Sequence, residues 1–247
     1  MSGILKVVGT PIGNLGDVSP RVREALEAAD VIAAEDTRRI GNLLASLGIG
    51  KKRLLSYFKD NEKGRVPQLV REMAEGNLTT VLVSDSGMPA VADPGALLVA
   101  AARAAGMRVE VIPGPSAVIH AVAGSGLPGP FVFAGFLPRK GKERREALTR
   151  LGTYPESIVV YESPFRVAET AADFAAAWGN RPAWLARELT KLHEEWIGPD
   201  LDSIKTTLAA REVKGECVFI VQGAVPVAQQ KPAGRKQKYP QPPRQPV

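Results

Sequence analysis

Carboxylates, hydroxyls and glycines are concentrated at residues 84–95 of this chain, SDSGMPAVADPG. The preceding residues, Thr79–Val83, are an unbroken β-branched and apolar run, which is typical of a strand buried on both faces of a parallel sheet. A helix is expected next, with Asp93 as its N-cap, Pro94 at its first position and Gly106 at its end. Because open α/β sheets bind ligands where their strands end, this long loop is the first candidate for a binding site.

A second cluster of polar side chains, residues 35–39 (EDTRR), follows the expected strand 31–34 and begins another helix. Its two carboxylates could accept protons in a reaction at the carboxyl edge of the sheet. They could equally complement the dipole of the helix in whose first turn they lie. The sequence leaves both interpretations open.

Residues 139–145 (RKGKERR) hold five cations and one acid at the expected start of a helix. Cations oppose the dipole at that end, so phosphate binding is favoured over a merely solvated helix start. The net charge of +6 is a weaker indication, because Lys231, Arg235, Lys236, Lys238 and Arg244 supply five of those charges. Removing these five leaves +1 for residues 1–230, so the folded body is close to neutral.

Common nucleotide-binding and nucleophile motifs do not occur in the sequence. Gly9 and Gly13 follow the first expected strand but lie four residues apart with Pro11 between them, unlike the dinucleotide fingerprint. There is no Gly-Lys-Ser/Thr and no G-x-S-x-G. These absences argue against a P-loop, a Rossmann cofactor site and a serine hydrolase.

The sequence contains one cysteine, Cys217, and two histidines, His120 and His193. A single cysteine cannot form an internal disulfide, so we expect the protein to work in a reducing cytoplasm. One cysteine and two histidines are too few ligands for a zinc cluster, so we expect no metal. His120 lies in an apolar helical stretch and is expected to be a core or packing residue. No apolar run reaches about 18 residues, and the N-terminus enters a strand directly, so no membrane span or signal peptide is expected.

Strand and helix patterns alternate along the chain, which predicts an α/β fold with a mainly parallel N-terminal sheet and a mixed C-terminal sheet. The breaker-rich residues 113–116 (PGPS) mark the boundary between a domain at 1–114 and a second at 115–225. Residues 226–247 are rich in Pro, Gln and cations and are expected to be disordered. The strands are expected near residues 4–8, 31–34, 54–57, 79–83, 108–112, 131–134, 158–161, 184–187 and 217–221.

Seven motifs together resemble one known family. They are residues 9–15 (GTPIGNL), 34–38 (AEDTR), 84–95, 113–117 (PGPSA), 135–138 (GFLP), 161–164 (YESP) and 186–191 (ARELTK). In this order they resemble the tetrapyrrole methylase superfamily of S-adenosylmethionine-dependent methyltransferases. Within it, they more closely resemble the ribosomal RNA methyltransferases that modify the ribose 2′-hydroxyl of a decoding-site cytidine in the small subunit.

The resemblance implies two α/β domains, usually in a homodimer, with S-adenosylmethionine in the cleft between them. It implies small-subunit ribosomal RNA, assembled in the subunit, as the partner. Carried over by position, the implied cofactor contacts are Pro11, Ile12, Ser84, Asp85, Gly87, Pro89, Asp93, Ser116, Ala117, Tyr161 and Ala186. The expected phosphate contacts are Arg38, Arg39, Lys51, Lys52, Arg53, Arg139, Lys140, Lys142, Arg144 and Arg145, with the basic tail as a further electrostatic hold.

A base must accept the hydroxyl proton, and the candidates are Glu35, Asp36, Asp60, Glu62 and Lys191. Glu35 and Asp36 rank first because their motif matches the family unaltered. Relatives usually carry histidines at the positions of Phe58, Asp60 and Phe165, so a mechanism based on imidazoles is not expected here. Two alternatives stay open: a tetrapyrrole C-methyltransferase, and a ribosome-assembly factor that keeps the fold without turnover.

Overall fold

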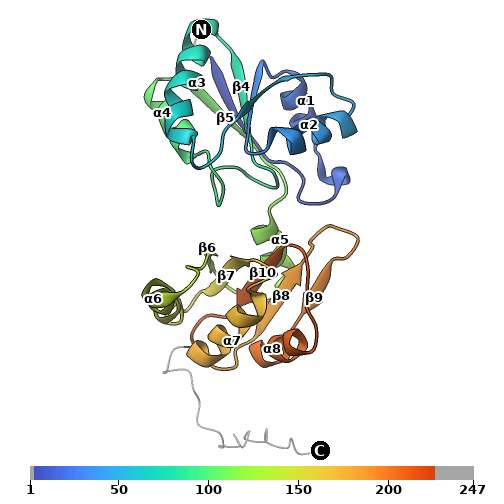
Figure 1. Cartoon of the computed structure of the whole chain (residues 1–247), viewed down its shortest axis with the longest axis vertical. Helices are drawn as coiled ribbons and strands as arrows, with labels where there is room; N and C mark the ends of the chain where they lie inside the picture. Colours follow the sequence, from blue (N-terminus) through green and yellow to red (C-terminus); the bar gives the residue numbers. More distant parts are fainter. Residues whose placement is uncertain (1–2, 226–247) are drawn as a thin grey trace, which may run out of the picture.

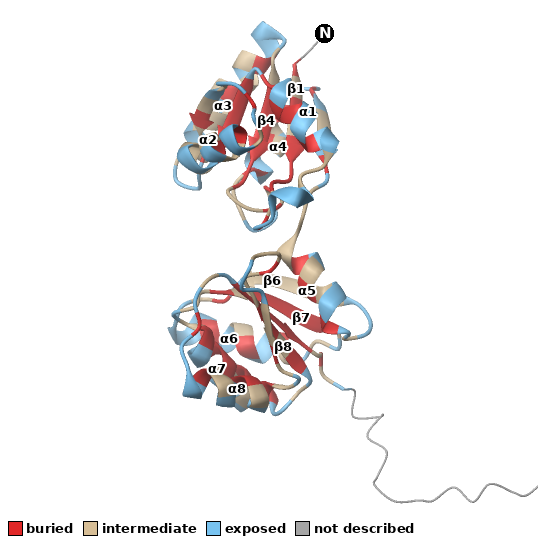
Figure 2. Cartoon of the chain, turned by 90° about the vertical axis from the view of Figure 1, so that its right-hand side faces the viewer, coloured by how far each residue is buried: buried red, intermediate tan, exposed pale blue. Residues whose placement is uncertain are grey.

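The computed structural model describes residues 3–225 of the 247-residue chain. The basic tail predicted to be disordered, residues 226–247, lies outside the described residues. The described part forms two five-stranded sheets, one above the other in Figure 1. The buried residues follow the strands of both sheets, while the outward sides of the helices are exposed (Figure 2).

The first sheet is wholly parallel and has the order β3-β2-β4-β1-β5. Its strands are β1 (Ile4–Val8), β2 (Val31–Ala34), β3 (Arg53–Ser56), β4 (Thr79–Val83) and β5 (Arg108–Ile112). The central strand β4 is buried over four of its five residues, as its β-branched and apolar composition predicts.

Helices cover both faces of this sheet. Helices α1 (Pro20–Glu27) and α2 (Thr37–Ser46) pack their apolar sides on one face, through residues such as Leu26 and Ile40. Helices α3 (Glu62–Gly76) and α4 (Ala96–Ala104) cover the other face, through residues such as Leu69 and Leu98. A short 3-10 helix, η1 (Leu15–Asp17), follows the loop after β1. Every strand of the sheet therefore ends at the same edge, which leaves that edge free to bind a ligand.

The second sheet is mixed, with the order β6-β7-β10-β8-β9. Its strands are β6 (Phe131–Phe136), β7 (Ser157–Glu162), β8 (Ala183–Arg187), β9 (Glu195–Ile197) and β10 (Cys217–Val221). Only the β6/β7 pair is parallel within the described residues, and β10 runs antiparallel between β7 and β8. The edge nearest the first sheet therefore combines the carboxyl ends of β6, β7 and β8 with the amino end of β10.

Helices α6 (Gly141–Leu151), α7 (Val167–Trp178) and α8 (Leu201–Ala210) cover one face of the second sheet. Helix α5 (Ala117–Ser125) packs on the other face through Val118 and Ala121. Ser116 caps α5, as its type and position predict, by accepting a hydrogen bond from the N–H of Ile119. The α/β fold with a parallel and a mixed sheet is confirmed. The boundary between residues 114 and 115 lies in the connection before α5 and stays a prediction.

Two sequence-based expectations were wrong, those for Asp93 and His120, and one strand was missed. Asp93 does not cap α4, which begins at Ala96 after Gly95. The short strand β9 was not expected, because three residues are too few to show a period. His120 is not a core residue, since its side chain is 40% exposed and its Nε2 lies 3.8 Å from a carboxylate oxygen of Glu194.

Candidate functional site

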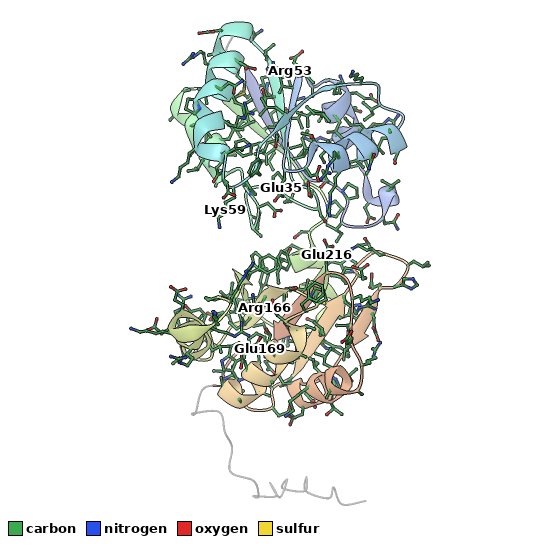
Figure 3. The ribbon with its side chains drawn as sticks, in the orientation of Figure 1. Glu35, Arg53, Lys59, Arg166, Glu169 and Glu216 are labelled. Carbon is green, nitrogen blue, oxygen red and sulfur yellow. The ribbon has the colours of Figure 1, made fainter. Side chains whose placement is uncertain are left out.

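A pocket of about 410 Å³ opens between the facing edges of the two sheets. Figure 3 shows Glu35 at the edge of the first sheet and Glu216 at the facing edge of the second. The first sheet contributes Ile12, Glu35, Arg39, Asp85, Ser86, Gly87, Met88, Val91, Ala92 and Asp93 to its lining. The second part of the chain contributes Ser116, Ala117, Phe136, Tyr161, Glu162, Ser163, Pro164, Gly215, Glu216, Cys217 and Val218.

The loops after β1 and β4 are joined into one rigid unit beneath the pocket. Thr10 and Gly87 form an antiparallel bridge, with N–H to O distances of 2.9 and 3.2 Å. The buried hydroxyl of Thr10 also donates to the carbonyl of Ser84 at 3.2 Å. The hydroxyl of Ser84 donates to the carbonyl of Gly87 at 3.2 Å. These bonds fix the backbone of the long loop without using the carboxylates that it carries.

Five carboxylates, those of Glu35, Asp85, Asp93, Glu162 and Glu216, line this pocket from both sheets. Burial, followed by repulsion from Asp93 and Asp85, raises the pKa of Glu35. Burial also raises the pKa of Asp93, although a hydrogen bond with Ser84 opposes the change. An acidic pocket of this kind is suited to a ligand that carries positive charge.

Arg39 brings a cation to the same pocket, with its Nε 3.6 Å from an oxygen of Asp85. The other oxygen of Asp85 accepts the backbone N–H of Asp36 at 2.9 Å. Asp85 thus ties the start of α2 to the long loop. The guanidinium of Arg39 keeps donors that could meet a carboxylate of a bound ligand.

Asp36 does not line the pocket, and its carboxylate is used locally. It caps α2 by accepting the backbone N–H of Arg38 at 2.8 Å, and it pairs with the guanidinium of Arg38 at 3.0 Å. The hydrogen bonds from Arg38 lower the pKa of Asp36 to about 2. Of the two carboxylates ranked first as bases, only Glu35 is therefore in position to meet a ligand in this pocket.

Aromatic and apolar side chains form the wall on the second sheet. Tyr161 packs edge-on against Phe133 and Phe136, with ring centroids 4.9 and 5.6 Å apart. Burial, with a contribution from Asp93, raises the pKa of Tyr161 to about 12. Burial likewise raises the pKa of the Cys217 thiol to about 11, so this cysteine is a poor nucleophile. This apolar wall can pack against a planar ring of a ligand, while charged side chains on the first sheet can bind its polar groups.

Most residues expected to contact a cofactor do come together here. Ile12, Asp85, Gly87, Asp93, Ser116, Ala117 and Tyr161 line the pocket. The other four, Pro11, Ser84, Pro89 and Ala186, do not line it. Ser84 and Ala186 are buried behind the lining, where they support the loop and the second sheet. Glu162 and Pro164 belong to a motif that was singled out, whereas Glu216 carries no local signal and was missed.

The remaining candidate bases lie outside this pocket. Glu62 accepts a hydrogen bond from the hydroxyl of Tyr57 at 3.1 Å, and Asp60 is exposed. The Nζ of Lys191 donates to Glu188 at 2.8 Å and to Glu216 at 3.0 Å. Burial opposes the charge of Lys191, but the two carboxylates outweigh it and raise its pKa. A lysine held as a cation in this way is poorly suited to accept a proton.

The basic residues expected to bind phosphate do not share one surface. Arg53 begins β3 and pairs with Glu72 at 2.9 Å, and Figure 3 shows it at the edge away from the pocket. Lys51 and Lys52 precede it in the chain, and Lys52 is bound to carbonyl oxygens of Glu27 and Ala29. These three cations therefore lie at the amino-terminal edge of the first sheet. Arg38, which is exposed, and Arg39 lie at the carboxyl edge, beside the pocket.

Arg144 was expected to contact phosphate, and this expectation was wrong, because its side chain is buried. Its guanidinium pairs with Asp173 at 2.7 Å and donates to the Thr170 hydroxyl and to the carbonyl of Pro138. Its neighbours Arg139, Lys140, Lys142 and Arg145 are exposed. A position four residues before Leu148 and seven before Leu151 lies on the apolar side of a helix, so the spacing could have identified the buried arginine.

Neither a metal centre nor a membrane segment is found among residues 3–225. No cluster of three or more His, Cys, Asp or Glu side chains is arranged to hold a metal ion there. In the same residues, no helix combines the length and apolar character needed to cross a bilayer.

The sequence matches one family model, Tetrapyrrole (Corrin/Porphyrin) Methylases, over residues 5–205. It is 46% identical over 226 residues to ribosomal RNA small subunit methyltransferase I of Xylella fastidiosa (strain Temecula1), covering 90% of this chain and 82% of the relative. It is 42% identical over 222 residues to the protein of the same name from Thermotoga maritima, covering 90% of this chain and 99% of the relative.

Among solved structures, the fold is similar to that of a cobalt precorrin-4 methyltransferase, with a TM-score of 0.65 and 19% identity. That alignment covers 89% of this chain and 94% of the other. A uroporphyrin-III C-methyl transferase from Thermus thermophilus, in complex with S-adenyl homocysteine, aligns with a TM-score of 0.62 and 19% identity. Here the coverage is 89% of this chain and 97% of the other. At these identities the likeness concerns the fold alone.

Proposed function

The chain belongs to the tetrapyrrole (corrin/porphyrin) methylase family and, within it, to the ribosomal RNA small subunit methyltransferase I family, and from this premise we propose its reaction. It uses S-adenosylmethionine to methylate small-subunit ribosomal RNA. The acceptor is the ribose 2′-hydroxyl of a decoding-site cytidine in 16S RNA. The enzyme works in the cytoplasm, as a homodimer, on the assembled small subunit.

The observation that carries the proposal is the acidic pocket between the two sheets. S-adenosylmethionine offers a sulfonium, an ammonium and a carboxylate, and it supplies a methyl group already activated for transfer. Asp85, Asp93 and Glu216 provide acceptors for the positive groups, and Arg39 provides donors for the carboxylate. Tyr161 and Ala117 provide an apolar surface for the adenine ring. The donor and acceptor set of the pocket therefore fits the cofactor.

Glu35 is the proposed proton acceptor. It lines the pocket at the carboxyl end of β2, and its raised pKa brings it closer to the proton affinity that a general base needs near neutral pH. Asp36 acts indirectly, by capping α2 and so fixing the backbone that carries Glu35. Much of the remaining rate enhancement comes from holding the acceptor hydroxyl in line with the transferred group.

The RNA is held by exposed cations: Arg38 at the carboxyl edge of the first sheet, and Arg139, Lys140, Lys142 and Arg145, which follow Phe136 of the pocket wall in the chain. Lys59 is a further candidate that was not expected, since Figure 3 shows it at the edge of the first sheet that faces the second. Lys51, Lys52 and Arg53 lie at the opposite edge and are not part of this proposal. These contacts position the RNA backbone and supply the salt-dependent share of the affinity.

The test is transfer of labelled methyl groups from S-adenosylmethionine to small ribosomal subunits from a strain that lacks this gene. The expected result is label on the ribose 2′-oxygen of one cytidine, located by nuclease mapping. Label on a corrin or porphyrin precursor, with none on RNA, would replace the proposal by a tetrapyrrole C-methyltransferase. Cofactor binding in calorimetry without transfer to either substrate would indicate a ribosome-assembly factor.

A further inference from the structure

Three of the seven phenylalanines, all of them within residues 3–225, are exposed. Phe58, Phe136 and Phe165 have 38%, 59% and 96% of their surface accessible. Phe58 follows the end of β3, Phe136 ends β6, and Phe165 lies three residues beyond the end of β7. All three therefore stand at carboxyl ends of strands, on the edges between which the pocket opens. Single exposed apolar side chains are common on protein surfaces, but three phenylalanine rings on the edges of one pocket point to a ligand that they contact.

Phe136 and Phe165 border the pocket most directly. Phe136 is a lining residue, and so are Ser163 and Pro164, which immediately precede Phe165. The backbone N–H of Phe165 donates to the hydroxyl of Ser163 at 3.4 Å, which forms a tight turn at the pocket rim. The two rings thus stand on separate loops beside the same opening.

Arg166 ties these loops to each other, and Arg144 anchors the first of them to α7. Arg166 donates through Nη2 to the carbonyl oxygens of Leu137 and Pro138, at 3.2 Å each, and lies 3.4 Å from the buried carboxylate of Glu162. The buried Arg144 donates to the same carbonyl of Pro138 at 3.0 Å. The residues that follow Phe136 and Phe165 are therefore locked by charge-assisted hydrogen bonds. A ring held out by a rigid frame loses little entropy when a partner stacks on it.

The surroundings indicate the chemistry of the partner. Arg139 and Lys140 are exposed within four residues of Phe136, and Arg145 is exposed in the first turns of α6. Exposed aromatic rings beside exposed cations are the combination that binds single-stranded nucleic acid, since the rings stack on bases and the cations contact phosphates. A protein partner would be expected to cover a broader apolar patch than these separated rings.

We propose that Phe165, with Phe136, stacks on the base of the nucleotide to be methylated after that base has left its helical stack. The stacked base holds its own sugar at the mouth of the pocket, so that the 2′-hydroxyl faces Glu35. This inference rests on the proposed function and adds a substrate-positioning contact to it. Stacking tolerates any base, so Phe165 positions the nucleotide, while hydrogen bonds elsewhere select the cytidine.

The experiment compares Phe165→Ala, Phe165→Leu, Phe165→Tyr and Phe165→Trp with the wild type on small ribosomal subunits. Val225→Ala is the matched control, because Val225 is 54% exposed and does not line the pocket. We expect kcat/KM for the subunit to fall roughly 10- to 100-fold in the alanine and leucine variants. The tyrosine and tryptophan variants should stay within about threefold of the wild type, because they keep the ring. The dissociation constant for S-adenosylmethionine, measured by calorimetry, should be unchanged in all of them.

Three outcomes would overturn the inference while the wild type still methylates RNA. One is an alanine variant within about twofold of the wild type, and another is a leucine variant as active as the tyrosine variant, which would indicate plain apolar contact. The third is a smaller mass by light scattering in the alanine variant, which would place Phe165 at a contact between copies. If the wild type transfers no methyl group to RNA, the proposed function itself is wrong and this inference fails with it.

Discussion

The backbones of Gly9 and Gly114 touch where the first sheet meets the connection to the second. A Cβ atom on Gly9 would lie 2.6 Å from the Cα of Gly114, and one on Gly114 would lie 2.7 Å from the Cα of Gly9. Real Cβ atoms do not approach other atoms so closely. Only two glycines allow this contact, which brings the loop after β1 against the residues that lead into α5. The pocket depends on it, because Ile12 and Ser116 on either side both line the cavity.

Gly114→Ala should therefore destabilise the protein by about 1–3 kcal/mol, because backbone has to move to admit the methyl group. Cofactor affinity should fall with it, since the shift separates the two sides of the pocket. Gly64→Ala is the control: Gly64 is exposed within α3, has nothing within 4 Å of an added Cβ, and should gain about 0.5–1 kcal/mol. Urea unfolding and calorimetry measure both effects. Equal stability of the two variants would contradict the proposed role of the contact.

Glu35 and Asp36 are adjacent, yet they should respond differently to neutralisation. Glu35→Gln should lower kcat by about 10²–10⁴-fold, because the proposed base is lost while the side-chain shape is kept. Asp36→Asn should keep kcat within a few-fold, because asparagine also caps a helix. The wild-type rate should fall as the pH drops through the raised pKa of Glu35, above its ordinary value of 4.5. A Glu35→Gln variant that keeps wild-type kcat and the same acid limb would remove Glu35 from the mechanism.

The carboxylate of Asp93 is expected to lower the stability of the fold and to strengthen cofactor binding. Burial raises its pKa above 3.8, so the folded state holds this proton more tightly than the unfolded state. The unfavourable contribution is therefore absent below pH 3.8 and develops as the pH rises through the folded pKa. Asp93→Asn should raise Tm at pH 7 by about 1–3 °C, and the gain should shrink as the pH falls.

The same Asp93→Asn variant should bind S-adenosylmethionine roughly tenfold more weakly, because one acceptor for its positive groups loses its charge. Thermal unfolding without the cofactor and calorimetry with it separate the two effects. If the variant lost stability at pH 7, burial of the Asp93 carboxylate would not be what makes the charged form unfavourable.

The fold was predictable wherever strands are buried on both faces. Thr79–Val83 and Cys217–Val221 were expected with their observed bounds, because long β-branched runs between breakers have few alternatives. Asp93 was misassigned as a helix cap because its position before Pro94 fits that role locally. The helix begins three residues after Asp93, at Ala96, and Asp93 lines the pocket instead. Local capping rules cannot anticipate this role, because the pocket is formed by residues that are far apart in the sequence.

Residues of the pocket could be predicted only where they belong to a motif that resembles the family. The loop residues Asp85 and Gly87 were expected and line the pocket. Glu216 was not expected, because its place depends on the antiparallel pairing that sets Cys217 opposite Glu162. No local pattern in residues 211–216 encodes that register.

The cations beside the pocket and those at the far edge should differ in their effect on RNA binding. Replacing Arg139 and Lys140 by alanine should flatten the plot of log affinity against log salt by about 1.4–1.8, because each neutralised phosphate adds roughly 0.7–0.9. Replacing Lys51 and Arg53 should leave the slope unchanged, because they lie at the amino-terminal edge. Filter binding to small subunits at several salt concentrations measures both. Equal slopes for the two double variants would mean that the RNA reaches the far edge as well.

Arg144 and Arg145 are adjacent residues of the same type, yet their replacement should have different effects. The first should affect the free energy of unfolding, and the second should affect RNA binding. Arg144→Ala should destabilise the protein by about 2–4 kcal/mol, because it removes the donor to the Asp173 carboxylate and to the buried Thr170 hydroxyl. The lower part of that range is favoured, since the Asp173 side chain is 35% exposed and water can compensate.

Arg145→Ala should change the free energy of unfolding by less than about 0.5 kcal/mol, because the side chain is exposed and forms no ion pair within residues 3–225. It should instead weaken binding to small subunits and reduce the salt slope by about one phosphate contact. Urea unfolding of both variants measures the change in stability, and binding to small subunits at several salt concentrations measures the change in RNA contacts. If Arg145→Ala were the destabilising change, or if Arg144→Ala reduced the salt slope at full stability, the assignment of one arginine to the frame and the other to RNA would be reversed.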